Sequence, residues 1–436
     1  MTIASKQINV SCAWAVSGTA EAVRPVQTVR DAGLAIDGKY EYQTANWLYR
    51  TIGENIGELR DRFVFNDAFA GFATPAAIGT TGAGFTSVKV CNGDANAANG
   101  YFVAGLNTSA NAYEVYSYDN AGATAIYSNT LPAALVVNDI VGDTSGSNKV
   151  MVIGSSGTGG KAYRASAANT WTDVTATLFS PAASAAPLRR VERMSLYASS
   201  FGDFTAVMGD KGQVFLQNVS SGFDLNNTFS GITPPTGMST VNFGAAAFAM
   251  SGTSYTGGTW KMLFFGDSRH VMSYAFPTTT QLSNVLPSSV SAVNAATNME
   301  RAGIIVAGGS RTDGKGFIAY CSDLLGNTWS EIDPNVHGIT SPITELRTNG
   351  QGGLVAIAGG VLYGGFPDDG NPWKQLSTLS GLTDVVIAGY NNRQVGIEQD
   401  ARATFPAMSL LVGIPGTTPV RVGYGKSRFF AGRTMI

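Results

Sequence analysis

The stretch IIVAGGSRTDGKGFIAYCSDLLGNTWSEI, residues 304–332, contains three runs of strand-forming residues separated by two turns. The first two runs, IIVAG and GFIAYC, are rich in β-branched, aromatic and other apolar residues, and Gly and Asp lie between them. Two such runs joined by a Gly-containing turn predict a β-hairpin. The polar segment before Trp329 then leads the chain into a third, outermost strand.

The same phrase, an apolar run that ends on glycine, recurs along the chain. Its six copies are YFVAG (to Gly105), VMVIG (Gly154), TAVMG (Gly209), MLFFG (Gly266), IIVAG (Gly308) and LVAIAG (Gly359). Their spacing averages about 51 residues, within the range of repeat architectures. A second strand follows each copy, another strand precedes most of them, and a shorter seventh set begins at TDVVIAGY.

Three or four hairpin-linked strands in each unit predict an all-β fold, a β-propeller of about seven blades with six as the alternative. We expect residues from about 83 to 406 to close the ring. The glycine-ended runs are expected to be the inner strands, because strands packed on both faces read as nearly continuous apolar runs. The predicted domains are an N-terminal segment, 1–65, and a propeller with C-terminal closing strands, 66–436.

Composition excludes several classes of function. Charged residues make up 13% of the chain and the formal net charge is -2, so no nucleic-acid partner is expected. The basic cluster Arg189, Arg190 and Arg193 is interpreted as a solvated strand edge. Gln7, Asn9 and Ser11 interrupt the apolar core that a signal peptide would need, and no stretch is long enough to insert in a membrane. We therefore expect synthesis in the cytoplasm without a signal peptide.

Metal, cofactor and catalytic sites are not expected. The three cysteines lie far apart, and neither His270 nor His337 has a second ligand at metal spacing. The loop GSSGTGGKA, 154–162, lacks the Walker pattern and joins two strands, so it is interpreted as a hairpin turn. No arginine recurs at matching places near the predicted inner strands, and no serine lies in a nucleophile elbow.

The turn before Trp329 has a partial copy earlier in the chain. Cys321-x-Asp323-x-x-Gly326-x-Thr328-Trp329 aligns with Ser117-x-Asp119-x-x-Gly122-x-Thr124, and weaker copies end at Trp171 and Trp373. The pattern resembles the Asp-box of sialidase-like (BNR-repeat) propellers, with one residue inserted between Asp and Gly. That resemblance implies a structural turn away from any active site. The Asp carboxylate would accept backbone N–H bonds, Gly would supply positive φ, and Trp would pack on the blade.

The N-terminal segment contains the only clear helical pattern. Its apolar residues recur at steps of four and three, a heptad seam formed by Ala45, Tyr49, Ile52, Ile56, Leu59 and Phe63. The seam predicts either a contact between subunits or an amphipathic helix packed on its own propeller.

The phrase IDGKYEYQTANWLYRTIGENIGEL, residues 36–59, resembles the attachment segment of bacteriophage tail-fibre proteins. That resemblance implies a virion protein of the tail that attaches by its N-terminus and displays the propeller for host-surface binding. It further implies a homo-oligomer, with a trimer favoured, that contacts other tail proteins and a host glycan or protein. Two alternatives are a purely architectural tail or capsid-decoration protein and a glycan-cleaving propeller enzyme. The sequence does not identify receptor-binding residues.

Overall fold

The computed structural model describes most of the chain between residues 76 and 422. The described ranges are 76–77, 85–92, 101–118, 124–127, 131–142, 149–165, 170–183, 186–195, 203–219, 225–251, 259–299, 304–321, 323, 326–348, 354–365, 373–375, 380–388, 409–413 and 421–422. They fall within one compact unit that includes Gly71–Lys426. The predicted attachment segment, 1–65, and its heptad seam lie outside the described residues.

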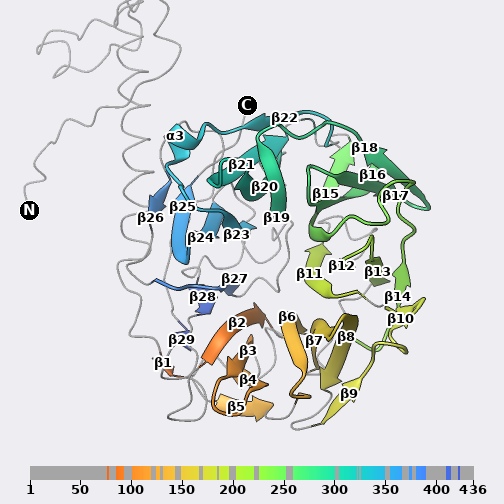
Figure 1. The fold of residues 1–436 in the computed structure, drawn as a ribbon, viewed down its shortest axis with the longest axis vertical. Coiled ribbons are helices and arrows are strands. Elements are labelled where there is room, and N and C mark those ends of the chain that lie inside the picture. The colour runs from red at the N-terminus through yellow and green to blue at the C-terminus, as the bar shows by residue number, and fades with distance from the viewer. Residues whose placement is uncertain are drawn as a thin grey trace, which may run out of the picture. The chain divides into compact units, whose positions relative to one another are not determined.

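Six blades of four antiparallel strands surround a common axis, and one of them has a fifth, parallel strand at its outer edge (Figure 1). The first blade is β2 (Phe85–Asn92), β3 (Tyr101–Asn107), β4 (Ala112–Tyr118) and β5 (Thr124–Tyr127), and the second is β6 (Leu135–Gly142), β7 (Val150–Ser156), β8 (Gly159–Ala165) and β9 (Trp171–Asp173). The third is β11 (Leu188–Ser195), β12 (Asp203–Gly209), β13 (Val214–Val219) and β14 (Phe229–Gly231), with β10 (Phe179–Ser180) parallel to β14. The fourth is β15 (Phe243–Ser251), β16 (Thr259–Gly266), β17 (Val271–Ala275) and β18 (Thr278–Leu282). The fifth is β19 (Val290–Met299), β20 (Ile304–Arg311), β21 (Gly316–Cys321) and β22 (Trp329–Glu331), and the sixth is β23 (Ile343–Thr348), β24 (Leu354–Ala358), β25 (Val361–Gly365) and β26 (Lys374–Gln375).

The protein is therefore a six-bladed β-propeller, which confirms the all-β prediction at the lower of its two blade counts. A two-stranded sheet of β27 (Asp384–Ala388) and β28 (Ser409–Gly413) lies between the sixth and first blades, where β27 contacts both β23 and β2. A further short pair joins β1 (Ala76–Ala77) to β29 (Arg421–Val422). In the described ranges the one helix is α3 (Pro334–His337), which Asp333 caps at its N-terminus.

The glycine-ended runs are not the innermost strands, and this part of the prediction is wrong. They are the second strands, β3, β7, β12, β16, β20 and β24, whereas β2, β6, β11, β15, β19 and β23 line the axis. A second strand is hydrogen-bonded along both edges and buried on both faces, so its residues are almost all apolar, as in Val150–Ser156. Four of the six innermost strands, β2, β6, β11 and β23, carry charged side chains at the axis, so they do not read as continuous apolar runs.

A recurrent β-bulge accounts for a glycine in the second strand of the second, third and fifth blades. All six innermost strands have a register irregularity near their N-terminal end, for example between Val137 and Asp139 in β6 and between Val293 and Ala295 in β19. A Cβ at Gly154 would overlap the carbonyl of Val136, and one at Gly309 would overlap that of Ala292. Glycine is therefore required because the bulged backbone approaches the second strand too closely for a side chain.

Aromatic residues fill the spaces between blades. Between the third and fourth blades the Phe204 and Phe248 rings meet edge to face with centroids 5.3 Å apart, beside the fully buried Phe264. Full burial of such a side chain contributes about 1.5–3 kcal/mol. Repeated packing of this kind fixes neighbouring blades against one another and holds the axial side chains in place.

Candidate functional site

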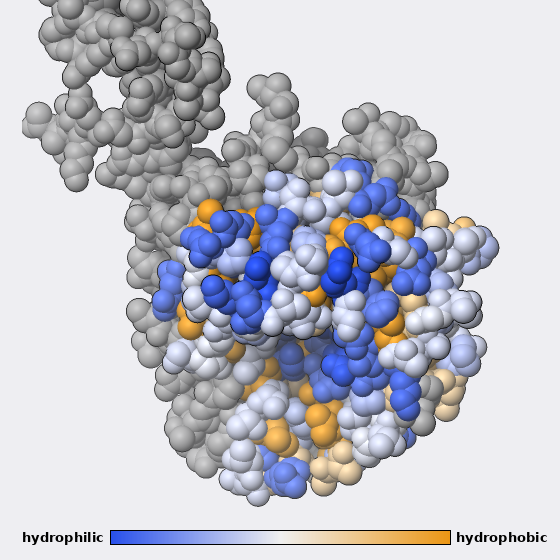
Figure 2. All heavy atoms as spheres, turned by 45° about the horizontal axis from the view of Figure 1, so that its top comes forward, coloured by the Kyte–Doolittle hydropathy of each residue, from blue (hydrophilic) through white to orange (hydrophobic). Residues whose placement is uncertain are grey.

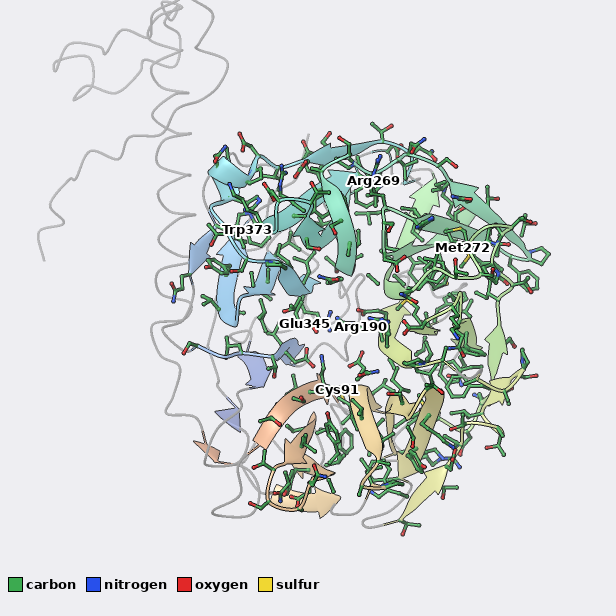
Figure 3. All side chains as sticks on the ribbon, viewed as in Figure 1. Cys91, Arg190, Arg269, Met272, Glu345 and Trp373 are labelled. Carbon is green, nitrogen blue, oxygen red and sulfur yellow. The ribbon has the colours of Figure 1, made fainter. Side chains whose placement is uncertain are left out.

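The innermost strands of four blades, together with β27, bring seven charged side chains together at the axis of the ring. This axial cluster consists of Lys89 on β2, Asp139 on β6, Arg190 and Glu192 on β11, Glu345 and Arg347 on β23, and Asp384 on β27. Figure 3 shows Arg190 and Glu345 directed at one another across the centre of the propeller. The fourth and fifth blades contribute no charge at the position after the bulge, where they carry Ala245 and Ala295.

Four of these charges form a closed set of ion pairs between the third and sixth blades. The Arg190 guanidinium donates to both carboxylate oxygens of Glu345, with Nη1 to Oε1 at 2.6 Å, and its Nε donates to Glu192 at 2.8 Å. Arg347 completes the set, since its Nη2 lies 3.2 Å from Glu345 and its Nη1 lies 3.6 Å from Glu192. Each arginine therefore contacts both glutamates, which links blades on opposite sides of the axis.

Two aspartates extend the cluster into the contacts between neighbouring blades. Asp139 accepts from the backbone N–H of Val191 at 2.8 Å, and Asp384 accepts from that of Val90 at 2.9 Å. The residue before each aspartate donates to the same neighbouring strand. Asn138 Nδ2 donates to the Leu188 carbonyl and Thr383 Oγ1 donates to the Val88 carbonyl, both at 2.7 Å. These paired contacts join β6 to β11 and β27 to β2.

The electrostatics of the cluster follow from burial and from the charges facing each carboxylate. Burial alone would raise the pKa of Glu345, but Arg190, Arg347 and Lys89 overcome that effect and lower its pKa to about 2. For Asp384, burial and the nearby Glu345 raise the pKa to about 7 against the opposing effects of Lys89 and Arg347. Three cations thus face four carboxylates, one of which is partly protonated near neutral pH.

The pKa of Asp384 predicts a pH-dependent contribution to stability. A folded pKa above the unfolded value of 3.8 means that the contribution is fully present below pH 3.8 and is lost as pH rises through 7. The stability of the native protein minus that of Asp384→Asn should therefore fall by about 2 kcal/mol between pH 5 and pH 8. Urea unfolding of both proteins at the two pH values measures this difference, and an unchanged difference would contradict the assignment.

The basic cluster was predicted to be a solvated strand edge, and for Arg190 this prediction is wrong. Its side chain is 8% exposed, whereas Arg189 is 49% exposed and pairs with Asp210 at the surface. Successive side chains of a strand point in opposite directions, and the bulge between Leu188 and Arg190 lies at this place. Arg189 therefore fits the predicted surface position and Arg190 does not, while the side chain of Arg193 is not among those that the structure describes.

Sequence reasoning missed the axial cluster as a whole. A signal was present, because Arg-x-Glu at 190–192 and Glu-x-Arg at 345–347 are in reciprocal order and both lie in strands that precede a glycine-ended run. The order alone does not show that the two segments meet, since 155 residues separate Arg190 from Glu345.

The Asp323 turn makes the hydrogen bonds that its sequence predicts. Its carboxylate accepts from the backbone N–H groups of Gly326 at 3.0 Å and Thr328 at 2.9 Å, and Gly326 has a φ of 78°. Trp329 donates from Nε1 to the Gly326 carbonyl at 3.0 Å. The Trp329 ring also packs edge to face on Phe265 of the fourth blade, with centroids 5.5 Å apart. The turn thus contributes to a contact between two blades.

The other copies of this turn are described only in part. Ser117 lies in β4 and Thr124 in β5, but Asp119 and Gly122 lie outside the described residues. Trp171 begins β9, and Trp373 precedes β26 and covers Gly365. The segment 154–162 belongs to the β7–β8 hairpin, in agreement with its interpretation as a turn between strands.

Replacing Asp323 with Ala is expected to lower the free energy of unfolding by about 1–3 kcal/mol, because the loop N–H groups lose their acceptor. Thermal and urea unfolding measure the loss. Asp313→Ala, which changes an exposed aspartate in another turn of the same blade, provides the control. A lost activity with unchanged stability would show that Asp323 acts in a site.

The arrangement at the axis defines the site as a buried, internally paired charge cluster in a propeller. Among the described residues, no group of three or more His, Cys, Asp or Glu could hold a metal ion. Figure 2 shows a hollow in one face of the ring with hydrophilic residues beside it. In the part of the chain that the structure describes, no helix is long and apolar enough to cross a membrane.

Comparison with known proteins does not extend what the structure itself shows. No protein-family model matches the chain, and no curated protein matches it. Among solved structures, a chain of the "Crystal Structure of Mitotic Checkpoint Complex" aligns with 83% of this chain and 96% of its own length, at 11% identity and a TM-score of 0.48. That likeness carries no functional inference.

Proposed function

We propose that this protein is a structural component of a bacteriophage tail, attached to the virion by its N-terminal segment, with the propeller displayed for binding the host surface. The N-terminal resemblance supplies the virion assignment. The observation that carries the role of the propeller is the pairing of Arg190 and Arg347 with Glu192 and Glu345 at the axis. These groups stabilise a rigid ring, which suits a module that presents its surface to a partner.

The enzyme alternative deserves weight because arginines and carboxylates do converge at the axis, as a glycan-cleaving propeller would require. Both arginines, however, are engaged by glutamates of the same chain, and Glu345 is 1% exposed. A substrate carboxylate would have to displace Glu345 from two nitrogen atoms of Arg190. We therefore assign the axial cluster to the stability of the ring and propose that the protein is not an enzyme.

The proposed protein is made in the host cytoplasm and assembles into the tail as a homo-oligomer, with a trimer favoured. Its partners are other tail proteins and a glycan or protein of the host surface, and it needs no cofactor. The architectural alternative shares the virion location but lacks the host contact, so the location alone does not separate the two.

The test uses antibody fragments raised against the purified full-length protein. Particles of the phage that encodes the chain are imaged with the fragments bound, and adsorption to host cells is counted with and without them. We expect label on the tail and a loss of adsorption of at least tenfold. Label with unchanged adsorption would favour the architectural alternative, sugar released from host envelopes by the protein would favour the enzyme, and unlabelled particles would refute the virion assignment.

A further inference from the structure

The outer edges of the blades differ in how they are protected from pairing with another strand. An unpaired, uncharged edge invites a second chain, and natural sheets cover such edges, shorten them or place charges on them. The edge of β14 is covered by β10. The strands β9, β22 and β26 are two or three residues long and carry Asp173, Glu331 and Lys374. The side chains of β5 are not among those that the structure describes.

Among the described residues, β18 is not covered by a strand, although the Thr279 side chain donates from Oγ1 to the Thr233 carbonyl at 3.0 Å on one face of the blade. It has five residues, Thr-Thr-Thr-Gln-Leu, and no described strand pairs with its outer edge. Thr278, Thr280 and Gln281 are exposed. No Asp, Glu, Lys, Arg or His occurs between residues 271 and 299, so the strands on either side add no charge to this edge.

An exposed aromatic residue lies next to the same edge. Phe276 is 76% exposed and forms, with Pro277, the turn that joins β17 to β18. Among the described residues the other large exposed hydrophobic side chain is Val136, at 52%. The unprotected strand and the exposed ring are independent features that mark one surface.

The backbone of β18 fixes how a second strand would add to it. Ala275 and Thr278 close the two-residue turn, so they form a hydrogen-bonded pair, and such pairs alternate along an antiparallel ladder. The N–H and C=O groups of Thr279 and Gln281 therefore point away from β17. A second strand can pair with these two residues and with Thr280 between them.

We infer that β18 pairs antiparallel with β18 of a second copy of this chain, about a two-fold axis at Thr280. Thr279 of one copy then exchanges hydrogen bonds with Gln281 of the other, and the two Thr280 residues face each other as a non-hydrogen-bonded pair. Phe276 of one copy lies diagonally across from Leu282 of the other. The strand is self-complementary in this register and has no charge that would require an opposite one, so a second copy fits it.

This contact joins two four-stranded blades into one eight-stranded sheet. It does not involve the N-terminal seam and does not depend on the proposed tail function. It therefore adds a two-fold contact to whatever oligomer the seam forms.

The test is a disulfide between copies of Thr280→Cys in the full-length protein. Cα atoms of a non-hydrogen-bonded pair lie about 4.5 Å apart, within the range that a disulfide spans. Thr172→Cys, at the centre of the exposed edge strand β9, is the matched control. The native Cys91 and Cys321 are buried, and both variants also carry Cys12→Ser, because Cys12 lies outside the described residues. After mild oxidation we expect most of Thr280→Cys, and less than a tenth of Thr172→Cys, to run as a covalent dimer.

A second variant tests the same contact without introducing a cysteine. Thr280→Lys places a charge on the edge of each copy, and its mass by sedimentation should be half that of the native protein, whereas Thr172→Lys should keep the native mass. Equal cross-linking of the two cysteine variants, or an unchanged mass for Thr280→Lys, would overturn the inference. Neither result bears on the labelling of virions, so the two proposals fail separately.

Discussion

Arg190→Met is expected to lower the free energy of unfolding by about 3–5 kcal/mol, which is a large part of the stability of an ordinary domain. The Met side chain fills similar space without a charge. The change leaves Glu345 and Glu192 buried, and Glu345 keeps only Arg347 and Lys89 nearby. Removal of one partner of a buried ion pair is costly because the remaining charge has lost its water without compensation.

Arg189→Met is the matched control for this change. It removes the neighbouring arginine, which is half exposed and paired with Asp210, and surface pairs of this kind contribute about 0–1 kcal/mol. Urea unfolding followed by circular dichroism compares the two variants. Equal losses would show that Arg190 has no special role at the axis, and an intact fold with a lost activity would favour the enzyme alternative.

The second large effect is expected in the N-terminal seam, which lies outside the described residues. If Ile52 and Ile56 pack between subunits, each contributes about 1.5–3 kcal/mol of burial only in the assembly. Changing both to Asp should leave the propeller folded but yield chains that do not associate through the seam or join the virion. Sedimentation and particle incorporation measure the two outcomes.

A control for the seam is Glu54→Gln with Glu58→Gln, which alters the same segment outside the apolar positions. Its oligomers should match those of the native protein. Unchanged oligomers of the Ile52→Asp, Ile56→Asp variant would refute the seam, and the helix would then be an amphipathic helix packed on its own ring.

The fold was predictable because strands joined by hairpins recur at a regular spacing along the chain. In the second, third and fifth blades the bulge of the innermost strand also leaves no room for a side chain opposite it, at Gly154, Gly209 and Gly309. Strand order was predicted wrongly because apolar character was taken to mark the axis. Burial on both faces belongs to the second strand, whereas the innermost strand carries side chains such as Asp139 and Arg190.

The Asp323 turn was predictable because the backbone groups that Asp323 and Trp329 bond, those of Gly326 and Thr328, lie within the turn itself. The axial cluster was not, because its contacts join residues as far apart as Val90 and Asp384. Only closure of the ring brings these side chains together. A single arginine in a strand gives no sign of whether it will face solvent, like Arg189, or the axis, like Arg190.

We propose that the axial charges stabilise the ring through one another, and a double-mutant cycle measures this coupling. The free energies of unfolding of Arg190→Met, Glu345→Met and the double variant are compared with that of the native protein. If the two residues act on each other, the double variant should lose at least 2 kcal/mol less than the sum of the single losses, because it leaves neither charge without its partner. Additive losses would contradict the claim and would show that Arg190 and Glu345 serve separate purposes.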